Sequence, residues 1–186
     1  MSSVNNKTRR LTAMAMLVAV SVILIYAIHF PIFPAAPFLE YDPADIPILI
    51  GAFLFGPTAG LAITIVASVI QGVTVSAASQ FIGIVMHVIS TGSMVLVAGN
   101  IYKKMHTRKG AAVALAAGVV TMTVAMSICN LIFTPIFMGA PREAVVQMLV
   151  PVIIPFNLVK SGVNSLITFV VYKSISRLFA GHEKVN

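Results

Sequence analysis

The sequence predicts an all-α polytopic membrane protein with six transmembrane helices, a short second helix, and both termini in the cytoplasm. Of its 186 residues, 59% are hydrophobic and only 9% are charged, whereas soluble domains carry about 25% charged residues. The apolar residues fall in long runs, and a helix needs about 20 of them to cross a hydrocarbon core of about 30 Å. No run shows the alternation typical of a membrane barrel. We therefore expect one transmembrane domain over residues 1–186, with no separate soluble domain.

Five of the predicted spans are clear, and one is ambiguous. The first run is followed by further long runs, so it is not simply a cleaved signal peptide. A proline-rich segment, 31–43, separates it from the next run, and its prolines prevent a continuous helix. The run 46–55 is too short to cross upright and could be a short span, a re-entrant piece or an interfacial helix. The predicted spans are 11–30, 46–55, 58–76, 80–102, 111–134 and 151–178.

The distribution of charged residues indicates whether the short run 46–55 crosses the membrane. Lysine and arginine accumulate in cytoplasmic loops. For three basic clusters to share one side, an even number of spans must separate Arg10 from Lys103, which requires 46–55 to cross. This clustering accounts for the net charge of +7 without a nucleic-acid partner. The clusters are Lys7, Arg9 and Arg10; Lys103, Lys104, Arg108 and Lys109; and Lys173, Arg177 and Lys184; the opposite loops carry Glu40, Asp42, Asp45 and Glu143.

The last run contains the clearest candidate site. Polar groups at membrane depth are costly, so their positions are informative. Asn157, Lys160, Asn164 and Thr168 are spaced to share one helix face. If the helix begins near Pro155, Lys160 lies about 8 Å along it. A lysine can instead snorkel to the interface while asparagines join helices. Because snorkelling does not require two neighbouring amides, the pattern favours a ligand or transport role.

Further polar stripes occur in the other runs. In 111–134, we interpret the Ser and Thr residues as interhelical hydrogen-bonding groups and Asn130 as a ligand contact. Gln80 opens the fourth run, and we interpret His87 within it as a structural histidine. The stripes converge on the outer half of the bundle, beside the proline-rich segment. A pocket of amide and ammonium donors with apolar walls predicts a mostly neutral or weakly anionic polar ligand with an apolar portion.

Several absences point to a subunit rather than to an enzyme. The sequence has no Walker P-loop for ATP hydrolysis, and the five clear spans contain no acids of the kind that proton-coupled carriers use. The four histidines are dispersed and predict no metal site. Ala15 and Ala19 have the small-xxx-small spacing that allows close helix approach, within the bundle or to a partner. A self-sufficient small secondary carrier or channel is the alternative.

Four segments resemble the substrate-binding S components of energy-coupling factor (ECF) vitamin transporters, in particular the riboflavin-specific members. They are 38–47 (FLEYDPADIP), 51–60 (GAFLFGPTAG), Asn130 before Thr134-Pro135, and 155–162 (PFNLVKSG). The resemblance covers essentially the whole chain. It implies six helices, a short second helix, and an outer loop that closes over the vitamin. An S component for another vitamin, such as biotin, remains an alternative.

The resemblance also implies the location, the ligand and the partners. The chain would lie in the bacterial cell membrane and bind riboflavin or FMN as its transported ligand, with no cofactor. Its partners would be a membrane coupling subunit, facing Ala15 and Ala19, and two ATP-binding subunits that supply the energy. Together with the polar stripes, it predicts these ligand-binding residues: Leu39, Tyr41, Asp45, Gln80, Asn130, Asn157, Lys160 and Asn164.

Overall fold

The computed structural model describes residues 2–34, 36–75 and 80–181, and it is mainly helical. Helices alternate with short connections, apart from one longer segment after the first helix. The elements are α1 (Ser2–Ala27), β1 (Phe30–Pro31), β2 (Glu40–Tyr41), α2 (Asp45–Phe55), α3 (Pro57–Val73), α4 (Gln80–Lys104), α5 (Arg108–Met138), α6 (Arg142–Met148), a π-helical turn (Leu149–Ile153) and α7 (Ile154–Gly181).

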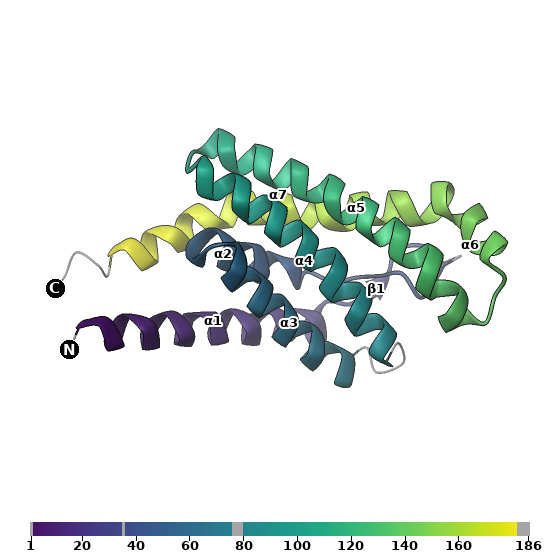
Figure 1. Cartoon of the computed structure of the whole chain (residues 1–186), viewed down its shortest axis with the longest axis horizontal. Coiled ribbons are helices and arrows are strands. Elements are labelled where there is room, and N and C mark those ends of the chain that lie inside the picture. The colour runs from purple at the N-terminus through teal and green to yellow at the C-terminus, as the bar shows by residue number, and fades with distance from the viewer. Residues whose placement is uncertain (1, 35, 76–79, 182–186) are drawn as a thin grey trace.

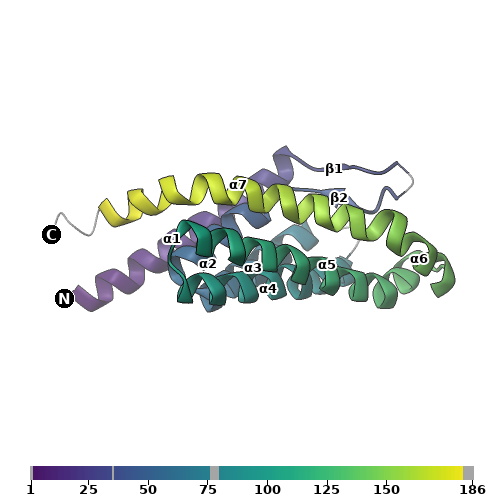
Figure 2. The ribbon, with the colours of Figure 1, turned by 90° about the horizontal axis from the view of Figure 1, so that it is seen from above.

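The helices run back and forth between two ends of the molecule (Figure 1). One end holds the start of α1, the α2–α3 turn, the α4–α5 connection and the end of α7. We call it the basic end, because Arg10, Lys103 and Arg108 lie there. The other, the hairpin end, holds the antiparallel β1–β2 pair and α6 (Figure 2). Successive long helices therefore connect opposite ends.

Each predicted apolar run contains a helix, but the boundaries differ in places. The first helix begins at Ser2, well before the apolar run, because the polar residues 2–10 continue the same helix. Helix α5 passes through Pro135 and ends at Met138, and the next residue, Gly139, caps it with a φ of 62° that suits a glycine. Helix α6 and the π-helical turn were not predicted. The proline-rich segment folds as a hairpin, consistent with the absence of helix there.

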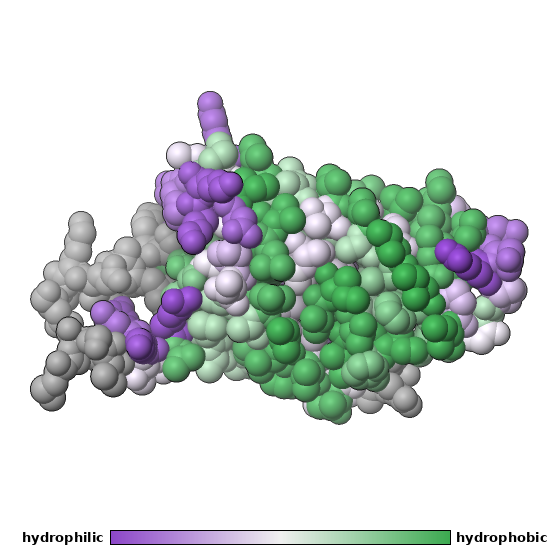
Figure 3. Space-filling view, viewed as in Figure 1, coloured by the Kyte–Doolittle hydropathy of each residue, from purple (hydrophilic) through white to green (hydrophobic). Residues whose placement is uncertain are grey.

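By length and hydropathy, four helical segments of the described chain could cross a membrane. They are Asn6–Ala27, Phe81–Lys104, Arg108–Met138 and Arg142–Ile175, while Asp45–Phe55 and Pro57–Val73 are shorter apolar helices. The surface agrees with this assignment, since an apolar belt separates polar groups at the two ends (Figure 3). Exposed side chains such as Ile23, Phe81 and Val170 are more than 60% exposed. Such a surface suits lipid rather than water.

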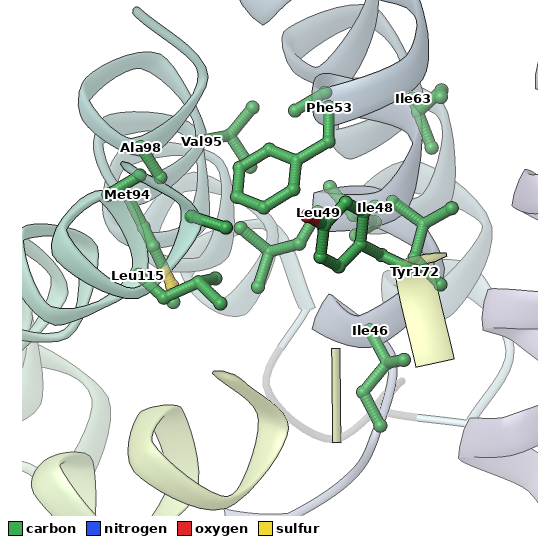
Figure 4. Close-up of a cluster of buried hydrophobic side chains, with 14 of the residues drawn as sticks. Ile46, Ile48, Leu49, Phe53, Ile63, Met94, Val95, Ala98, Leu115 and Tyr172 are labelled. Carbon is green, nitrogen blue, oxygen red and sulfur yellow. The ribbon is translucent and has the colours of Figure 1, made fainter. Parts of the chain in front are cut away.

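Helix α2 occupies the centre of the bundle. It is apolar on all sides, as expected of a buried helix, and the nine residues from Asp45 to Phe53 are all buried. Around Leu49 and Phe53 gather side chains from α3, α4, α5 and α7 (Figure 4). Gly60 allows this packing, because a Cβ there would meet Ala52 of α2 at 2.6 Å. This core fills the basic-end half of the molecule.

Candidate ligand-binding site

A cavity of about 300 Å³ lies towards the hairpin end, within the size range of small-molecule sites. Residues 38–42, which lead through β2 towards α2, form one wall, and α3, α4, α5 and α7 form the others. The wall is mostly apolar with a few polar groups. The lining residues are His29, Phe38, Leu39, Glu40, Asp42, Ser68, Gln71, Gly72, Val75, Ile82, Gly83, Ile84, Met86, His87, Met126, Asn130, Thr134, Phe137, Phe156 and Lys160.

An ion pair joins α7 to the segment that closes the cavity. The Lys160 ammonium donates to Oδ2 of Asp42 at 2.7 Å and to the carbonyl of Glu40 at 3.3 Å. Both charged side chains are largely buried, at 9% and 5% exposure. Burial favours the neutral acid, but Lys160 and His87 outweigh it and hold the pKa of Asp42 below its usual range. Asp42 is therefore a carboxylate, and the Lys160 charge is matched within the protein.

Asn164 fastens the same segment one helical turn further along α7. Its amide nitrogen donates to the carbonyl of Asp42 and to Oδ2 of Asp45, each at 3.0 Å. Its oxygen accepts a hydrogen bond from the hydroxyl of Tyr41 at 3.1 Å. These bonds occupy both ends of the amide. Asn164, Tyr41 and Asp45 therefore form a polar cluster beside the cavity, and none of the three lines it.

Apolar contacts hold the closing segment as well. Ala36 and Leu39 are buried against Val145, Ile153 and Phe156. The ring of Phe33 meets the ring of Phe156 edge-on, with centroids 6.5 Å apart. Helix α6 and the π-helical turn thus form part of the support for the closing segment, which explains their place at the hairpin end.

His87 lies at the junction of α2, α3 and α4. Its Nδ1 is 2.7 Å from the hydroxyl of Ser68, and its Nε2 is 3.7 Å from Oδ1 of Asp45. The Thr91 hydroxyl donates to that same carboxylate oxygen at 2.9 Å. The hydroxyl of Ser68 also donates to the carbonyl of Thr64. His87 is thus well partnered, as a structural histidine should be, but it lines the cavity too.

The two other candidate asparagines are both buried. Asn130 of α5 lines the cavity, donates to the carbonyl of Met126 and accepts from Thr134. Asn157 of α7 donates to the carbonyl of Ile153. Its side-chain oxygen has no hydrogen-bond partner within the described structure, although it is fully buried. A buried acceptor left unpaired is costly, which marks Asn157 as a group suited to an additional donor.

The structure brings most of the predicted residues to this region, in two groups. Leu39, Asn130 and Lys160 line the cavity, and Asn157 lies buried beside Phe156, which also lines it. Tyr41, Asp45 and Asn164 form the neighbouring polar cluster. Gln80 begins α4, but its side chain lies outside the described part of the chain. Ala15 and Ala19 are far from the cavity, on the exposed face of α1.

Sequence reasoning missed several residues of the wall. The acids Glu40 and Asp42 were assigned only to an outer loop. His29, which pairs with Glu40 at 2.9 Å, was weighed only as a metal ligand. Their proximity to Lys160 arises from chain segments about 120 residues apart. A lysine buried in an apolar span requires a carboxylate nearby, but the outer loops carry four acids, and the sequence does not distinguish among them.

These features define a helical membrane protein with a small, mainly apolar cavity that a loop segment closes near one surface. Residues 9–172 match the family model described as ECF transporter, substrate-specific component. The chain therefore belongs to the family of substrate-specific components of ECF transporters.

Individual relatives share nearly the full length of the chain. The riboflavin transporter FmnP of Bacillus subtilis (strain 168) is 30% identical, over 89% of this chain and 91% of its own. The riboflavin transporter RibU of Staphylococcus aureus (strain TCH60) is 27% identical, over 91% and 92% respectively. A solved S component of a bacterial ECF transporter superposes with a TM-score of 0.80 at 28% identity, covering 93% of this chain and 98% of that one.

Proposed function

We propose that this protein binds riboflavin in the cavity as the substrate-binding subunit of an ECF-type uptake transporter. The cavity carries the argument, because it combines apolar walls with a few buried polar groups. Riboflavin has a flat, largely apolar ring and a polyhydroxyl chain, so it needs both kinds of wall. Its hydroxyl groups could serve the unpaired oxygen of Asn157, and the amide of Asn130 can donate and accept. The names of the relatives support the same ligand.

The six-span topology is part of the proposal. Successive long helices connect the basic end and the hairpin end (Figure 1). Helix α2 has only 11 residues, so the closing segment that precedes it completes this crossing. Placing the basic end in the cytoplasm satisfies the positive-inside rule. Both termini are then cytoplasmic, and the cavity faces the outside, where an uptake protein must capture its ligand.

Helix α1 is the proposed contact with the membrane coupling subunit. It packs against α2 and α3 on one side only, with Ala13, Ser21 and Ile25 buried there. Its other face is exposed and carries Ala15 and Ala19. Small residues on an exposed helix face allow another helix to approach closely. Energy for transport would come from two ATP-binding subunits attached to that partner.

The absorption spectrum of the purified full-length protein tests the ligand directly. A preparation from riboflavin-rich cells should be yellow, with flavin absorption bands that disappear on unfolding and dialysis. Titration of the stripped protein with riboflavin should then quench flavin fluorescence saturably. A stripped, folded protein that does not respond to riboflavin would refute the proposed function.

A further inference from the structure

The charges around the cavity point to a specificity that the apolar walls do not provide. Among the described residues that line it, those with a full charge at neutral pH are Glu40, Asp42 and Lys160. Asp42 engages the Lys160 ammonium, as described above, so that cation is not available for an added anion. Glu40 adds a second negative charge at the wall, beside His29. The two carboxylates and the one ammonium of the wall therefore sum to a net negative charge.

Residues behind the wall do not reverse this balance. The carboxylate of Asp45 is fully buried and lies 3.7 Å from Nε2 of His87. It receives hydrogen bonds from Thr91 and Asn164, neither of which carries a charge. If His87 were protonated, it would only offset Asp45. Apart from Lys160, no lysine or arginine in the described part of the chain lines the cavity.

We propose that Asp42 is a specificity-determining residue, which neutralises Lys160 and thereby makes the cavity select an uncharged flavin over its 5′-phosphate. This inference rests on the proposed function. A phosphate monoester carries between one and two negative charges near neutral pH. In a cavity of about 300 Å³ it would lie within about 8–10 Å of the wall carboxylates, a distance over which charges are not fully screened even in saline water.

The geometry explains why the pair resists capture by an anion. A phosphate could recruit Lys160 only by displacing Asp42, which would leave a buried carboxylate unpaired, an expensive arrangement. Asp42 is also held by the amide of Ala44, which donates to its other oxygen at 3.1 Å. Asn164 holds the backbone of the same residue. Lys160 and Ala44 therefore hold the two oxygens of the carboxylate, and Asn164 holds its backbone.

The test is a comparison of dissociation constants for riboflavin and riboflavin 5′-phosphate, measured by fluorescence quenching on the purified full-length protein. The wild type should prefer riboflavin at least about tenfold at about pH 7.5. This preference should shrink at about pH 5, because the second phosphate proton binds with a pKa of about 6.

Substitutions test which residues cause the preference for riboflavin over its 5′-phosphate. Asp42→Asn frees the Lys160 charge and should reduce the riboflavin preference by at least about fivefold, and Glu40→Gln should reduce it to a smaller extent. Glu143→Gln is the matched control, because Glu143 is an exposed acid of α6 that does not line the cavity. Its ratio of dissociation constants should stay that of the wild type.

The outcomes separate the inference from the proposed function. Equal affinities for the two flavins in the wild type would overturn the inference alone. So would an unchanged preference in both Asp42→Asn and Glu40→Gln. If Asp42→Asn binds neither flavin, the inference is tested by two other measurements. These are the pH dependence of the wild-type preference and the preference of the Glu40→Gln variant. A wild type that binds no riboflavin would refute the proposed function and therefore also the inference that rests on it.

Discussion

The Nζ of Lys160 lies 2.7 Å from Oδ2 of Asp42, so an ammonium within α7 is joined to the segment that closes the cavity. This pairing changes the role expected of the lysine. From the sequence, Lys160 is a charge inside an apolar span that awaits a ligand. In the folded protein, it already has a partner from the same chain, and its first effect is to position the closing segment.

Removing one member of this pair should destabilise the protein more than removing both. Lys160→Met leaves the Asp42 carboxylate buried without its cation, which typically costs about 3–5 kcal/mol. The double variant with Asp42→Asn removes both charges and should recover most of the loss. Thermal unfolding of the ligand-free protein in detergent measures this. Lys104→Met, at an exposed lysine of the basic end, is the control, and a double variant no more stable than Lys160→Met would contradict the pairing.

The asparagines should matter for binding more than for folding. Asn157→Ala and Asn130→Ala should each weaken riboflavin binding by about 1–3 kcal/mol, the usual cost of leaving buried polar groups unpaired. That corresponds to about 5- to 150-fold in affinity, measured by fluorescence titration. Asn100→Ala is the matched control, because Asn100 is an exposed residue near the end of α4. This variant should bind riboflavin as the wild type does. Affinities within twofold of the wild type for both asparagine variants would place the ligand elsewhere.

The six-span membrane topology can be tested by labelling single introduced cysteines in intact cells, after Cys129 has been replaced. Labels at Ser3, Thr107 and Lys184 should be protected from an impermeant reagent, whereas a label at Pro37, an exposed residue of the closing segment, should react. The expectation follows from the clustering of basic residues at one end of the bundle. Reaction of positions 37 and 107 from the same side would eliminate the six-span arrangement.

Helix α1 should separate binding from transport. Ala19→Trp adds bulk to an exposed face and should prevent close approach of a partner helix. The variant should bind riboflavin nearly as the wild type does, yet fail to support ATP-dependent uptake and fail to co-purify with the coupling subunit. Ala116→Trp, on an exposed face of α5, provides the control. Full uptake by Ala19→Trp, or uptake by the isolated wild-type chain, would refute the subunit role.

Much of the architecture could be predicted from the sequence, because a bilayer imposes strong local constraints. Every backbone group in hydrocarbon must be hydrogen-bonded internally, so a long apolar run can only be a helix there. The runs 11–30 and 111–134 are recognisable for that reason. The hairpin of 30–41 was not predicted, since its pairing depends on contacts with α6 and α7. The π-helical turn before Ile154 has no comparable local pattern.

The candidate site also has features that follow from local sequence and features that depend on tertiary packing. By itself, the sequence determined that Asn130, Asn157 and Lys160 are polar groups at membrane depth, because helical periodicity and hydropathy are local properties. Only the tertiary structure decided that Asn164 holds the closing segment and that Asp42, 118 residues before Lys160 in the chain, is its counter-ion. Those choices depend on which distant segments pack together. A charge buried in a low-dielectric interior must find its partner in space, and the order of residues along the chain does not specify which one.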